Sequence, residues 1–368
     1  MTPGNEDELA QLIRGANGPL RITGGGTRPI GQADGEALTT RGLSGISLYE
    51  PGALTLVAGA GTPLAEIEAA LAAENQRLAF EPMDHRTLLG TDGTPTLGGM
   101  VAANASGPRR ISVGACRDFM LGVRFVDGAG NIVKNGGRVM KNVTGYDLVK
   151  LLTGSYGTLG VVTEVALKVM PDVETTGTLT ISGLSDSDAV AALAAALGSP
   201  FEVTGAAHLP KSPDGTPQTL VRIEGFETSV RYRSERLKEV LTPFGDVTAD
   251  VGGDTARWQA IRDVTALAQQ DGDVWRISAK PSEAPEIVAR ADAKAVQYDW
   301  GGGLIWLLCE AGRDLRAALG TYDGHATLIR GSADVPTFQP EAPALAKITA
   351  GLRAKFDPRG ILNPGIMT

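Results

Sequence analysis

The sequence predicts an α+β protein of two domains. The chain has 368 residues, which is more than one ordinary hydrophobic core accommodates. Strands that end in glycine turns and lead into helices fill the first 171 residues, whereas the following region has fewer glycines and alternates strands with alanine-rich helices. We therefore expect one domain over residues 1–171, a smaller α+β domain over 172–340, and a separate C-terminal segment over 341–368.

Two short strands with glycine turns open the first domain. The apolar stretch Leu20–Thr23 runs into Gly24-Gly25-Gly26-Thr27, and the stretch Leu54–Ala58 ends in a further glycine turn. A helix is predicted directly afterwards, because Thr62 is a good N-cap residue and Pro63 suits the first helical position. Three apolar residues of this helix fall on one face: Leu64, Ile67 and Leu71.

A loop, a hairpin and a last strand complete this domain. Residues Phe80–Gly107 are rich in Gly, Pro, Thr and Asn, which favours a long loop. Leu121–Val126 is predicted to be a strand, Asp127–Gly130 a hairpin turn and Asn131–Lys134 the returning strand. The strand Val161–Val169 then closes the domain at Pro171.

Beyond Pro171, strands and helices alternate. We expect strands over Thr176–Ile181, Leu220–Glu224 and Leu304–Cys309, the last of them buried because it is apolar throughout. An alanine-rich helix over Ser187–Leu197 is expected to pack on the core. The tail is predicted to form a helix over Pro343–Phe356, patterned by Leu345, Ile348 and Leu352.

Charge and hydropathy exclude several classes of protein. The net charge of −8 and the pI near 5.1 would repel a nucleic acid backbone. No stretch approaches the roughly 20 apolar residues that cross a bilayer, and the acidic N-terminus lacks the pattern of a secretion signal. We therefore expect a cytoplasmic protein with no membrane span of its own.

Cysteine and histidine are too few and too scattered for a metal site. Cys116 and Cys309 lie far apart in the sequence, and His85, His208 and His325 stand alone. Neither the cysteine pairs of a cluster nor the spaced histidines of a zinc site occur. We expect no metal in this chain, so any iron–sulfur chemistry must belong to another chain.

Glycine suggests backbone that lies close to a ligand. The chain has 48 glycines, concentrated before residue 165. Consecutive backbone amides at Gly24-Gly25-Gly26-Thr27 suit a pyrophosphate, although a glycine triplet is also typical of a plain tight turn. The run is not a Rossmann fingerprint, because Pro29 occupies the last glycine position, and no P-loop pattern occurs.

Two further segments suit a nucleotide in the same way. Small residues dominate Thr94–Gly107, where Thr96, Asn104 and Ser106 offer hydrogen bonds. The third segment, 141–163, pairs a helix start with a return into a strand, and there Gly157 and Gly160 let backbone amides meet a nucleotide.

These three segments, in this order, resemble the FAD-linked oxidase family of vanillyl-alcohol-oxidase type. The closing run Phe356-Asp357-Pro358-Arg359-Gly360-Ile361-Leu362-Asn363-Pro364-Gly365 adds to the likeness, which is dense over residues 20–171 and limited to length and position in the middle domain. The resemblance implies a PCMH-type FAD-binding domain of two subdomains, an α+β cap domain, and a tail that packs back on the first domain. Within the family the chain is most similar to the small FAD-binding subunits of bacterial glycolate oxidases.

The resemblance also implies which residues contact FAD. It assigns the pyrophosphate to Gly24, Gly25, Gly26, Thr27 and Arg28. It assigns the flavin and ribityl region to Pro82, Thr96, Gly98 and Gly99, and nearby contacts to Asn104, Ser106 and Gly107. It assigns the adenine end to Gly160 and Val162, and a flavin contact to Asn363. FAD is expected to be noncovalent, because the first loop offers no histidine or cysteine, and Cys116 is expected to be a buried structural residue.

The catalytic residues stay unknown at this point. Related 2-hydroxy-acid dehydrogenases carry a Gly-His-x-Gly-Asp-Gly-Asn stretch with metal-binding histidines, where this chain has Tyr322–Gly331 with one histidine. His325 with Arg330 is a candidate pair for a carboxylate, and His85 lies near the expected flavin loop. A purely structural role is the alternative for all three.

Three functions follow from these observations. In the first, the chain is the FAD-binding subunit of a heteromeric glycolate oxidase or dehydrogenase and assists electron transfer or assembly. Its partners would be a larger FAD-containing hydroxy-acid dehydrogenase subunit and an iron–sulfur subunit, the complex would take glycolate or D-lactate, and partners would attach it to the inner face of the membrane. In the second, it is a self-sufficient FAD-dependent 2-hydroxy-acid or alcohol oxidase with His325 or His85 as base. In the third, it is a non-redox scaffold subunit.

Overall fold

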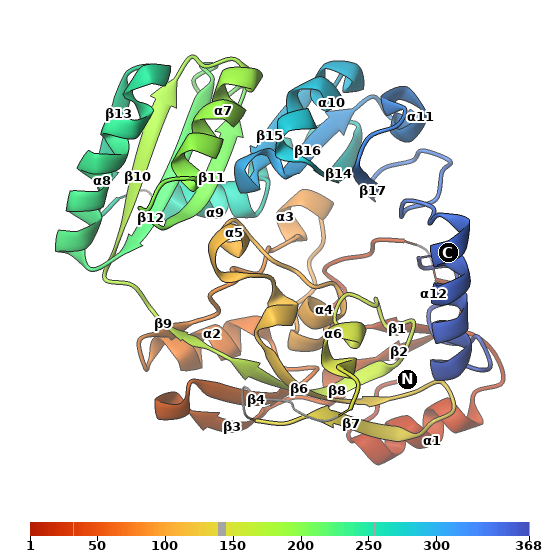
Figure 1. Cartoon of the computed structure of the whole chain (residues 1–368). Coiled ribbons are helices and arrows are strands. Elements are labelled where there is room, and N and C mark those ends of the chain that lie inside the picture. Colours follow the sequence, from red (N-terminus) through yellow and green to blue (C-terminus); the bar gives the residue numbers. More distant parts are fainter. Residues whose placement is uncertain (32, 139–144, 254, 368) are drawn as a thin grey trace.

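The computed structural model describes residues 1–31, 33–138, 145–253 and 255–367. Its two large sheets are separate in sequence: a five-stranded sheet formed before residue 169 and an eight-stranded sheet formed from residues 175–330. Figure 1 shows the five-stranded sheet and its helices below, the eight-stranded sheet and its helices above, and the C-terminal helix along one side. The mixed α+β architecture expected from the sequence is confirmed.

The five-stranded sheet is antiparallel and has the order β3-β4-β8-β6-β7. Its strands are β3 (Ile46–Glu50), β4 (Thr55–Gly59), β6 (Met120–Val126), β7 (Ile132–Gly136) and β8 (Val161–Lys168). Two smaller pairs accompany it: parallel β1 (Leu20–Thr23) with β2 (Glu36–Thr39), and antiparallel β5 (Gln76–Arg77) with β9 (Met170–Pro171). The predicted hairpin is confirmed as β6–β7.

Six short helices belong to this part of the chain. They are α1 (Glu6–Gly15), α2 (Leu64–Ala72), α3 (Arg86–Leu89), α4 (Leu97–Ala102), α5 (Arg110–Val113) and α6 (Leu148–Leu152). Helix α1 begins at Asn5, whose side chain accepts a hydrogen bond of 2.9 Å from the Glu8 amide. The predicted start of the third glycine segment, 141–144, lies outside the described residues.

The start of α2 differs from the sequence prediction. Leu64, Ile67 and Leu71 are buried as expected, but Pro63 holds the N-cap position and Thr62 makes no side-chain cap. The Thr62 hydroxyl instead donates to the Gly59 carbonyl at 2.7 Å and accepts from the Gly45 amide at 2.9 Å. The preference of threonine for a cap is overridden here by a turn that joins α2 to β4.

The segment expected to be one long loop contains two helices, α3 and α4. The side chain of Thr96 caps α4 by accepting a hydrogen bond from the Gly99 amide. A Cβ atom at Gly98 would lie 2.7 Å from the Ala60 Cβ, so glycine is required where this helix crosses the end of β4. The glycines that suggested a loop therefore serve close packing of a helix.

The eight-stranded sheet is antiparallel and has the order β13-β10-β12-β11-β15-β16-β14-β17. Its strands are β10 (Thr175–Ser182), β11 (Val203–Leu209), β12 (Gln218–Gly225), β13 (Val247–Val251), β14 (Asp273–Ala279), β15 (Ala295–Asp299), β16 (Leu304–Cys309) and β17 (Gly324–Arg330). Every residue of β16 is buried, as its apolar sequence predicts.

Helices pack on this sheet. They are α7 (Asp186–Leu197), α8 (Glu227–Leu241), α9 (Thr255–Arg262), α10 (Ala284–Ala291) and α11 (Leu315–Leu319). Five residues of α7 are buried, which confirms its expected core packing. Short 3₁₀ turns complete the chain: η1 (Thr40–Gly42), η2 (Pro51–Ala53), η3 (Cys116–Asp118), η4 (Thr242–Phe244), η5 (Thr265–Leu267), η6 (Pro281–Glu283) and η7 (Trp300–Gly302).

The C-terminal tail returns to the first strand. Helix α12 (Pro343–Phe356) forms where it is predicted, but none of its residues, all of them described, is buried. Its apolar residues Leu345 and Ile348 are 51% and 61% exposed. The return is made by the residues after the helix, because Leu362 forms a parallel bridge with Leu20 and the Asn363 amide donates to the Leu20 carbonyl at 3.0 Å.

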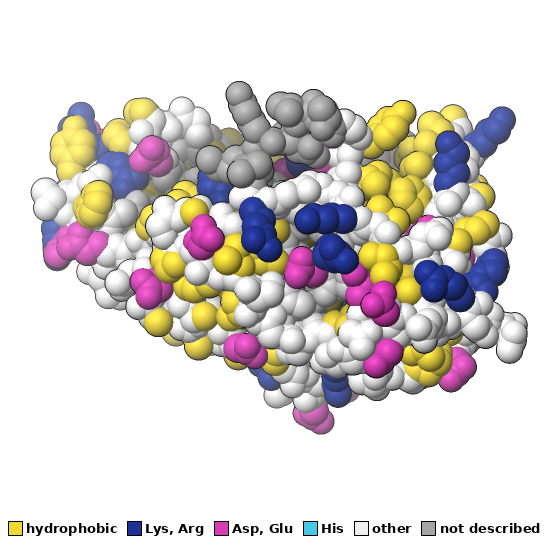
Figure 2. Space-filling model, turned by 90° about the horizontal axis from the view of Figure 1, so that it is seen from below, with side chains coloured by type: hydrophobic (Ala, Val, Ile, Leu, Met, Phe, Trp, Pro, Cys, Tyr) yellow, Lys and Arg dark blue, Asp and Glu magenta, His cyan; other side chains and the backbone are white. Residues whose placement is uncertain are grey.

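The face of the molecule below the five-stranded sheet carries mixed charge. Figure 2 shows Lys and Arg side chains on this face interspersed with Asp and Glu side chains and with apolar side chains. In the described part of the chain, no helix has both the length and the apolar character that a membrane span requires.

Candidate functional site: two joined cavities

A narrow cavity of about 210 Å³ lies where the predicted glycine segments meet. Strand β1 leads into it from one side, α4 borders it from a second side, and the turn before β8 closes it. Twelve residues predicted to contact FAD line this cavity: Gly24, Gly25, Gly26, Thr27, Arg28, Thr96, Gly98, Gly99, Gly157, Gly160, Val162 and Asn363. Segments far apart in the sequence therefore form one wall of backbone.

The loop after β1 is held too close to its neighbours for side chains. A Cβ atom at Gly25 would lie 1.5 Å from the Thr94 carbonyl oxygen, and one at Gly24 would lie 2.5 Å from the Thr96 hydroxyl oxygen. Gly26 has a φ of +76°, which L side chains rarely adopt. The Arg41 side chain fixes the loop by donating to the Gly25 carbonyl at 2.6 Å. Glycine is therefore required at positions 24 and 25 for packing against residues 94–96, and the loop presents its backbone to the cavity.

Asn363 lines the same cavity and also joins its walls. Its side-chain oxygen accepts from the Ile22 amide at 2.6 Å, and its side-chain nitrogen donates to the Tyr156 carbonyl at 2.8 Å. The side chain expected to contact the flavin is therefore engaged by backbone groups, and it links the tail to β1 and to the turn before β8.

Arg28 marks the boundary between this cavity and a larger one. Its Nε and Nη1 atoms are buried and have no hydrogen-bond partner among the described residues. Its guanidinium carbon lies 5.1 Å from the centroid of the Tyr156 ring. Burial of an unpaired cation is costly, so this arrangement fits an anionic group such as a pyrophosphate.

The larger cavity has a volume of about 610 Å³ and lies between the glycine segments and strands β14, β16 and β17. It shares Arg28, His85 and Tyr156 with the narrow cavity, so the two spaces adjoin, and they are called the joined cavities below. Asn104, Ser106 and Gly107 of the second glycine segment line it. Its apolar walls, including Leu304, Trp306 and Phe338, suit a flat ring system.

Both histidines proposed from the sequence lie at these cavities. Burial lowers the pKa of His85 well below its ordinary value, and the nearby charge of Arg28 lowers it further. Burial, followed by the charges of Arg276 and Arg110, lowers the pKa of His325. Both imidazoles are therefore neutral at neutral pH. The cations beside His325 also disfavour a metal ion there.

Two residues predicted for the site lie elsewhere. Pro82 lines a separate pocket beside Arg77 and Glu224 and does not line either joined cavity. Arg330 also lies outside both linings, because its guanidinium donates to the carbonyls of Leu88 at 2.8 Å and Gln270 at 2.7 Å. The candidate pair of His325 with Arg330 is thus not formed, because Arg330 ties β17 to neighbouring loops.

Cys116 is buried in the core of the five-stranded sheet and does not line the joined cavities. Burial raises the pKa of its thiol, so the thiolate needed for a covalent flavin link is strongly disfavoured.

Three residues that line the larger cavity were not found from the sequence: Arg110, Arg276 and Asp299. Asp299 ends β15 and is fully buried, and its Oδ1 accepts a hydrogen bond of 2.7 Å from the Trp300 amide. The Trp300 ring in turn donates to the Gly107 carbonyl at 3.0 Å and joins the upper sheet to the second glycine segment. One signal was available, because Arg276 interrupts the apolar run of β14.

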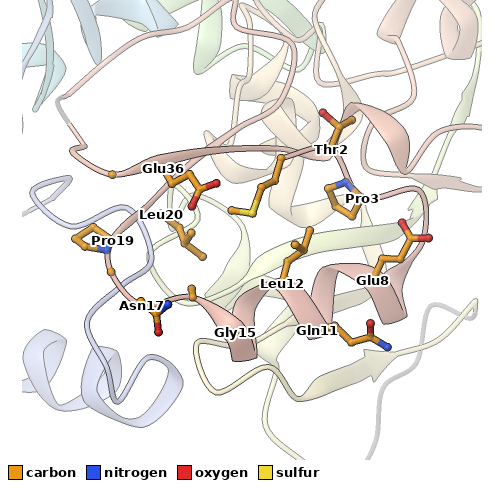
Figure 3. Close-up of a pocket in the computed structure, with 14 residues that line it drawn as sticks. Thr2, Pro3, Glu8, Gln11, Leu12, Gly15, Asn17, Pro19, Leu20 and Glu36 are labelled. Carbon is orange, nitrogen blue, oxygen red and sulfur yellow. The ribbon is translucent and has the colours of Figure 1, made fainter.

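A third pocket, of about 870 Å³, opens between α1 and the starts of β1 and β2 (Figure 3). Two of its lining residues are acidic, Glu8 and Glu36, and none of the described lining residues is Lys, Arg or His. Despite its size this pocket does not suit an anionic dinucleotide. The joined cavities, which are lined by glycines and Arg28, suit such a ligand better.

Comparisons with known proteins agree with this assignment. Residues 1–136 match the family model described as a FAD binding domain. The glycolate oxidase subunit GlcE of Escherichia coli (strain K12) is 36% identical over 366 residues, 98% of this chain and 93% of that relative. The glycolate oxidase subunit GlcD of Bacillus subtilis (strain 168) is 28% identical over 71% of this chain and 48% of that relative. The structure of a VAO-type flavoprotein from Myceliophthora thermophila C1 matches with a TM-score of 0.65 at 14% identity, over 97% of this chain and 76% of that one.

The FAD-binding domain and the glycine-lined cavity define a FAD-binding flavoprotein, whose fold is similar to that of a VAO-type flavoprotein. The chain belongs to the family of FAD-linked oxidoreductases that includes the glycolate oxidase subunit GlcE. FAD is accordingly its cofactor.

Proposed function

We propose that this chain is the FAD-binding subunit of a heteromeric glycolate oxidase, which converts glycolate to glyoxylate, an oxidation of a CH–OH group. Similarity to GlcE over almost the whole chain supports this proposal, because GlcE is itself named as a subunit of such an oxidase. The weaker similarity to GlcD suggests that a larger sister chain shares the same flavoprotein architecture. That sister chain would oxidise the hydroxy acid, glycolate or D-lactate.

In this proposal the chain assists electron transfer or assembly, while an iron–sulfur subunit accepts electrons. Residues 1–171 form the FAD domain, 172–340 the cap domain and 341–368 the tail that closes on the FAD domain. The complex works in the cytoplasm, at the inner face of the membrane through its partners.

The observation that carries the FAD assignment is the half-buried side chain of Arg28, whose Nε and Nη1 atoms are buried and unpaired among the described residues, beside a wall of glycine backbone. Bound FAD supplies the redox chemistry at its ring. The chain would hold its pyrophosphate with Arg28 and the Gly24–Gly26 backbone, and Gly157 and Gly160 would leave room for the nucleotide. Binding would be noncovalent, because the buried Cys116 does not line either cavity and the loop after β1 has only Thr27 and Pro29 on either side of Arg28.

The proposal is tested by assaying the purified single chain with glycolate and D-lactate and an artificial electron acceptor. We expect one FAD per chain, released on denaturation, and negligible turnover. Activity is expected to appear only when the sister and iron–sulfur subunits are added. Robust turnover by the single chain would instead establish a self-sufficient oxidase, and a colourless chain with no affinity for FAD would establish a scaffold.

A further inference from the structure

The larger cavity contains three cationic side chains that form no ion pair within the described residues, although Asp299 lies in the same cavity. Arg28, Arg110 and Arg276 line it, and none of them forms an ion pair with another described residue. Arg110 and Arg276 stack on one ring, with guanidinium carbons 4.5 and 5.3 Å from a ring centroid of Trp300. Two cations beside one half-buried ring repel each other, and a bound anion would relieve this repulsion.

These arginines keep their charge despite burial. Burial lowers the pKa of Arg276 to about 10, with further lowering by Arg28 and Arg110, so that Arg276 remains a cation at neutral pH. Arg110 is affected in the same direction, first by burial and then by Arg117. The neutral imidazole of His325 lies in the same cavity and offers a hydrogen bond without adding charge.

Arg110 and Arg276 do not line the narrow glycine cavity. Their positive charge therefore lies in the part of the larger cavity that is away from Gly24–Arg28, the loop expected to bind the pyrophosphate. Guanidinium groups match the planar, two-oxygen geometry of a carboxylate. The Asp299 carboxyl group in the same cavity disfavours the second charge of a phosphate and leaves a monoanion as the better fit.

We propose that Arg110 and Arg276 bind the carboxylate of a small 2-hydroxy or 2-oxo acid, which gives this chain a carboxylate site of its own. The choice of acid rests on the proposed function, whereas the anion site rests on the arginines alone. A glycolate oxidase built in this way has a carboxylate position in this subunit in addition to that of its sister chain.

The test is a calorimetric titration of the FAD-loaded chain with pyruvate, a 2-oxo acid that this chemistry does not oxidise. We expect saturable binding that weakens roughly tenfold or more in Arg276→Met and in Arg110→Met, because each loses a charge-assisted hydrogen bond. Arg276→Lys is expected to retain part of the affinity. The matched control Arg290→Met removes an exposed arginine of α10 and is expected to change nothing. Pyruvamide, which lacks the charge, is expected not to bind.

Several results would overturn the proposal. They are a yellow, FAD-loaded wild-type chain that ignores pyruvate, unchanged affinity in both arginine variants, or sulfate binding as tightly as pyruvate. Loss of FAD from Arg276→Met with the pyruvate affinity unchanged would show that Arg276 serves the cofactor instead. A colourless wild-type chain would defeat the proposed function, which is a distinct outcome.

The same site predicts a pH dependence. Burial raises the pKa of Asp299 to about 7, opposed by the charges of Arg222 on β12 and Arg276 on β14 and reinforced by Glu81. The other titratable or charged groups that line its cavity are His85, Arg28, Arg110, Tyr156, Arg262, His325 and Glu341. Above pH 7 the ionised Asp299 carboxylate repels a bound anion, and below pH 7 it is neutral. Pyruvate affinity should therefore rise as pH falls through 7.

The measurement is pyruvate affinity between pH 6 and 8.5 in wild type and in Asp299→Asn. We expect at most about a tenfold change per pH unit in wild type and a flat profile in the variant. Burial lowers the pKa of both histidines from the ordinary value, so the Asp299→Asn variant, which keeps both, separates their contribution from that of Asp299. Equal slopes in the two proteins would remove Asp299 from the site.

Discussion

Gly26→Val is expected to produce a folded protein that retains much less FAD. Space is not the limit, since the atom nearest to an added Cβ is the Arg41 Nη2 at 3.8 Å. The limit is the backbone, because a φ of +76° is a strained conformation for a β-branched residue, costing about 1–2 kcal/mol or more. Without FAD, the loop after β1 in Gly26→Val is expected to relax to an unstrained conformation in which its amides no longer face the cavity. FAD binding must restore the strain, so affinity should fall by roughly tenfold or more.

The matched control is Gly312→Val. Gly312 has a φ of +78° and no atom within 4 Å of an added Cβ, but it lies before α11, away from both cavities. The two variants thus carry the same backbone strain in different places. Flavin absorbance per chain after gel filtration should drop in Gly26→Val and stay at wild-type level in Gly312→Val. Full flavin content in Gly26→Val would mean that the loop after β1 does not hold the cofactor.

The parts of the fold that the sequence predicts are those governed by local patterns. The β6–β7 hairpin, the apolar strand β16 and the alanine-rich helix α7 all form where their residue patterns place them. Helix α4 was missed because Gly98 and Gly99 suggest a loop. Their real constraint is the contact between Gly98 and Ala60, which comes from a distant strand and has no signature in the local sequence.

The candidate site likewise has parts that local sequence patterns predict and parts that depend on tertiary packing. The glycine wall is predictable because each segment carries its own run of small residues. The anion site is not, because Arg110 comes from α5, Arg276 from β14 and Asp299 from β15, and only the packing of the two sheets brings them together. Arg110 and Arg276 differ from Arg330 because they form no ion pair within the described residues, and that difference depends on the fold. Sequence position alone favoured Arg330, which hydrogen-bonds to backbone carbonyls.

A network of ion pairs joins residues 77–109 of the first domain to strand β12 of the eight-stranded sheet. Glu224 of β12 accepts from Arg109 Nε at 2.7 Å and from Arg77 Nη1 at 3.0 Å. Glu81 accepts from Arg222 Nη2 at 2.7 Å and pairs with Arg109 at 2.9 Å. The network links residues 77–109 to β12, so it holds the walls of the larger cavity in register.

Glu224→Gln is expected to destabilise the protein strongly. The substitution keeps the side-chain shape but leaves the two buried guanidinium groups of Arg109 and Arg222 with one carboxylate, Glu81, while the half-buried Arg77 keeps Asp172. Removal of one partner from a buried pair costs about 3–5 kcal/mol. Thermal unfolding at pH 7 should shift down by roughly 5–10 °C. Glu286→Gln, an exposed carboxylate of α10, is the control and is expected to unfold as wild type does.

The dependence of stability on pH gives an independent check of the Glu224→Gln prediction. Burial acts to raise the pKa of Glu224, but the hydrogen bond from Arg109 and the charges of Arg222, Arg109 and Arg77 outweigh it and hold the pKa far below 4.5. A depressed carboxyl pKa stabilises the fold at pH above 4.5, and this contribution is lost as pH falls below that value toward the folded pKa. Wild type should therefore lose more stability between pH 5 and pH 3 than Glu224→Gln, so the two melting curves converge in acid. If the gap between them stayed constant with pH, the network would act through shape and hydrogen bonds, and the charge of Glu224 would contribute nothing to holding the sheets together.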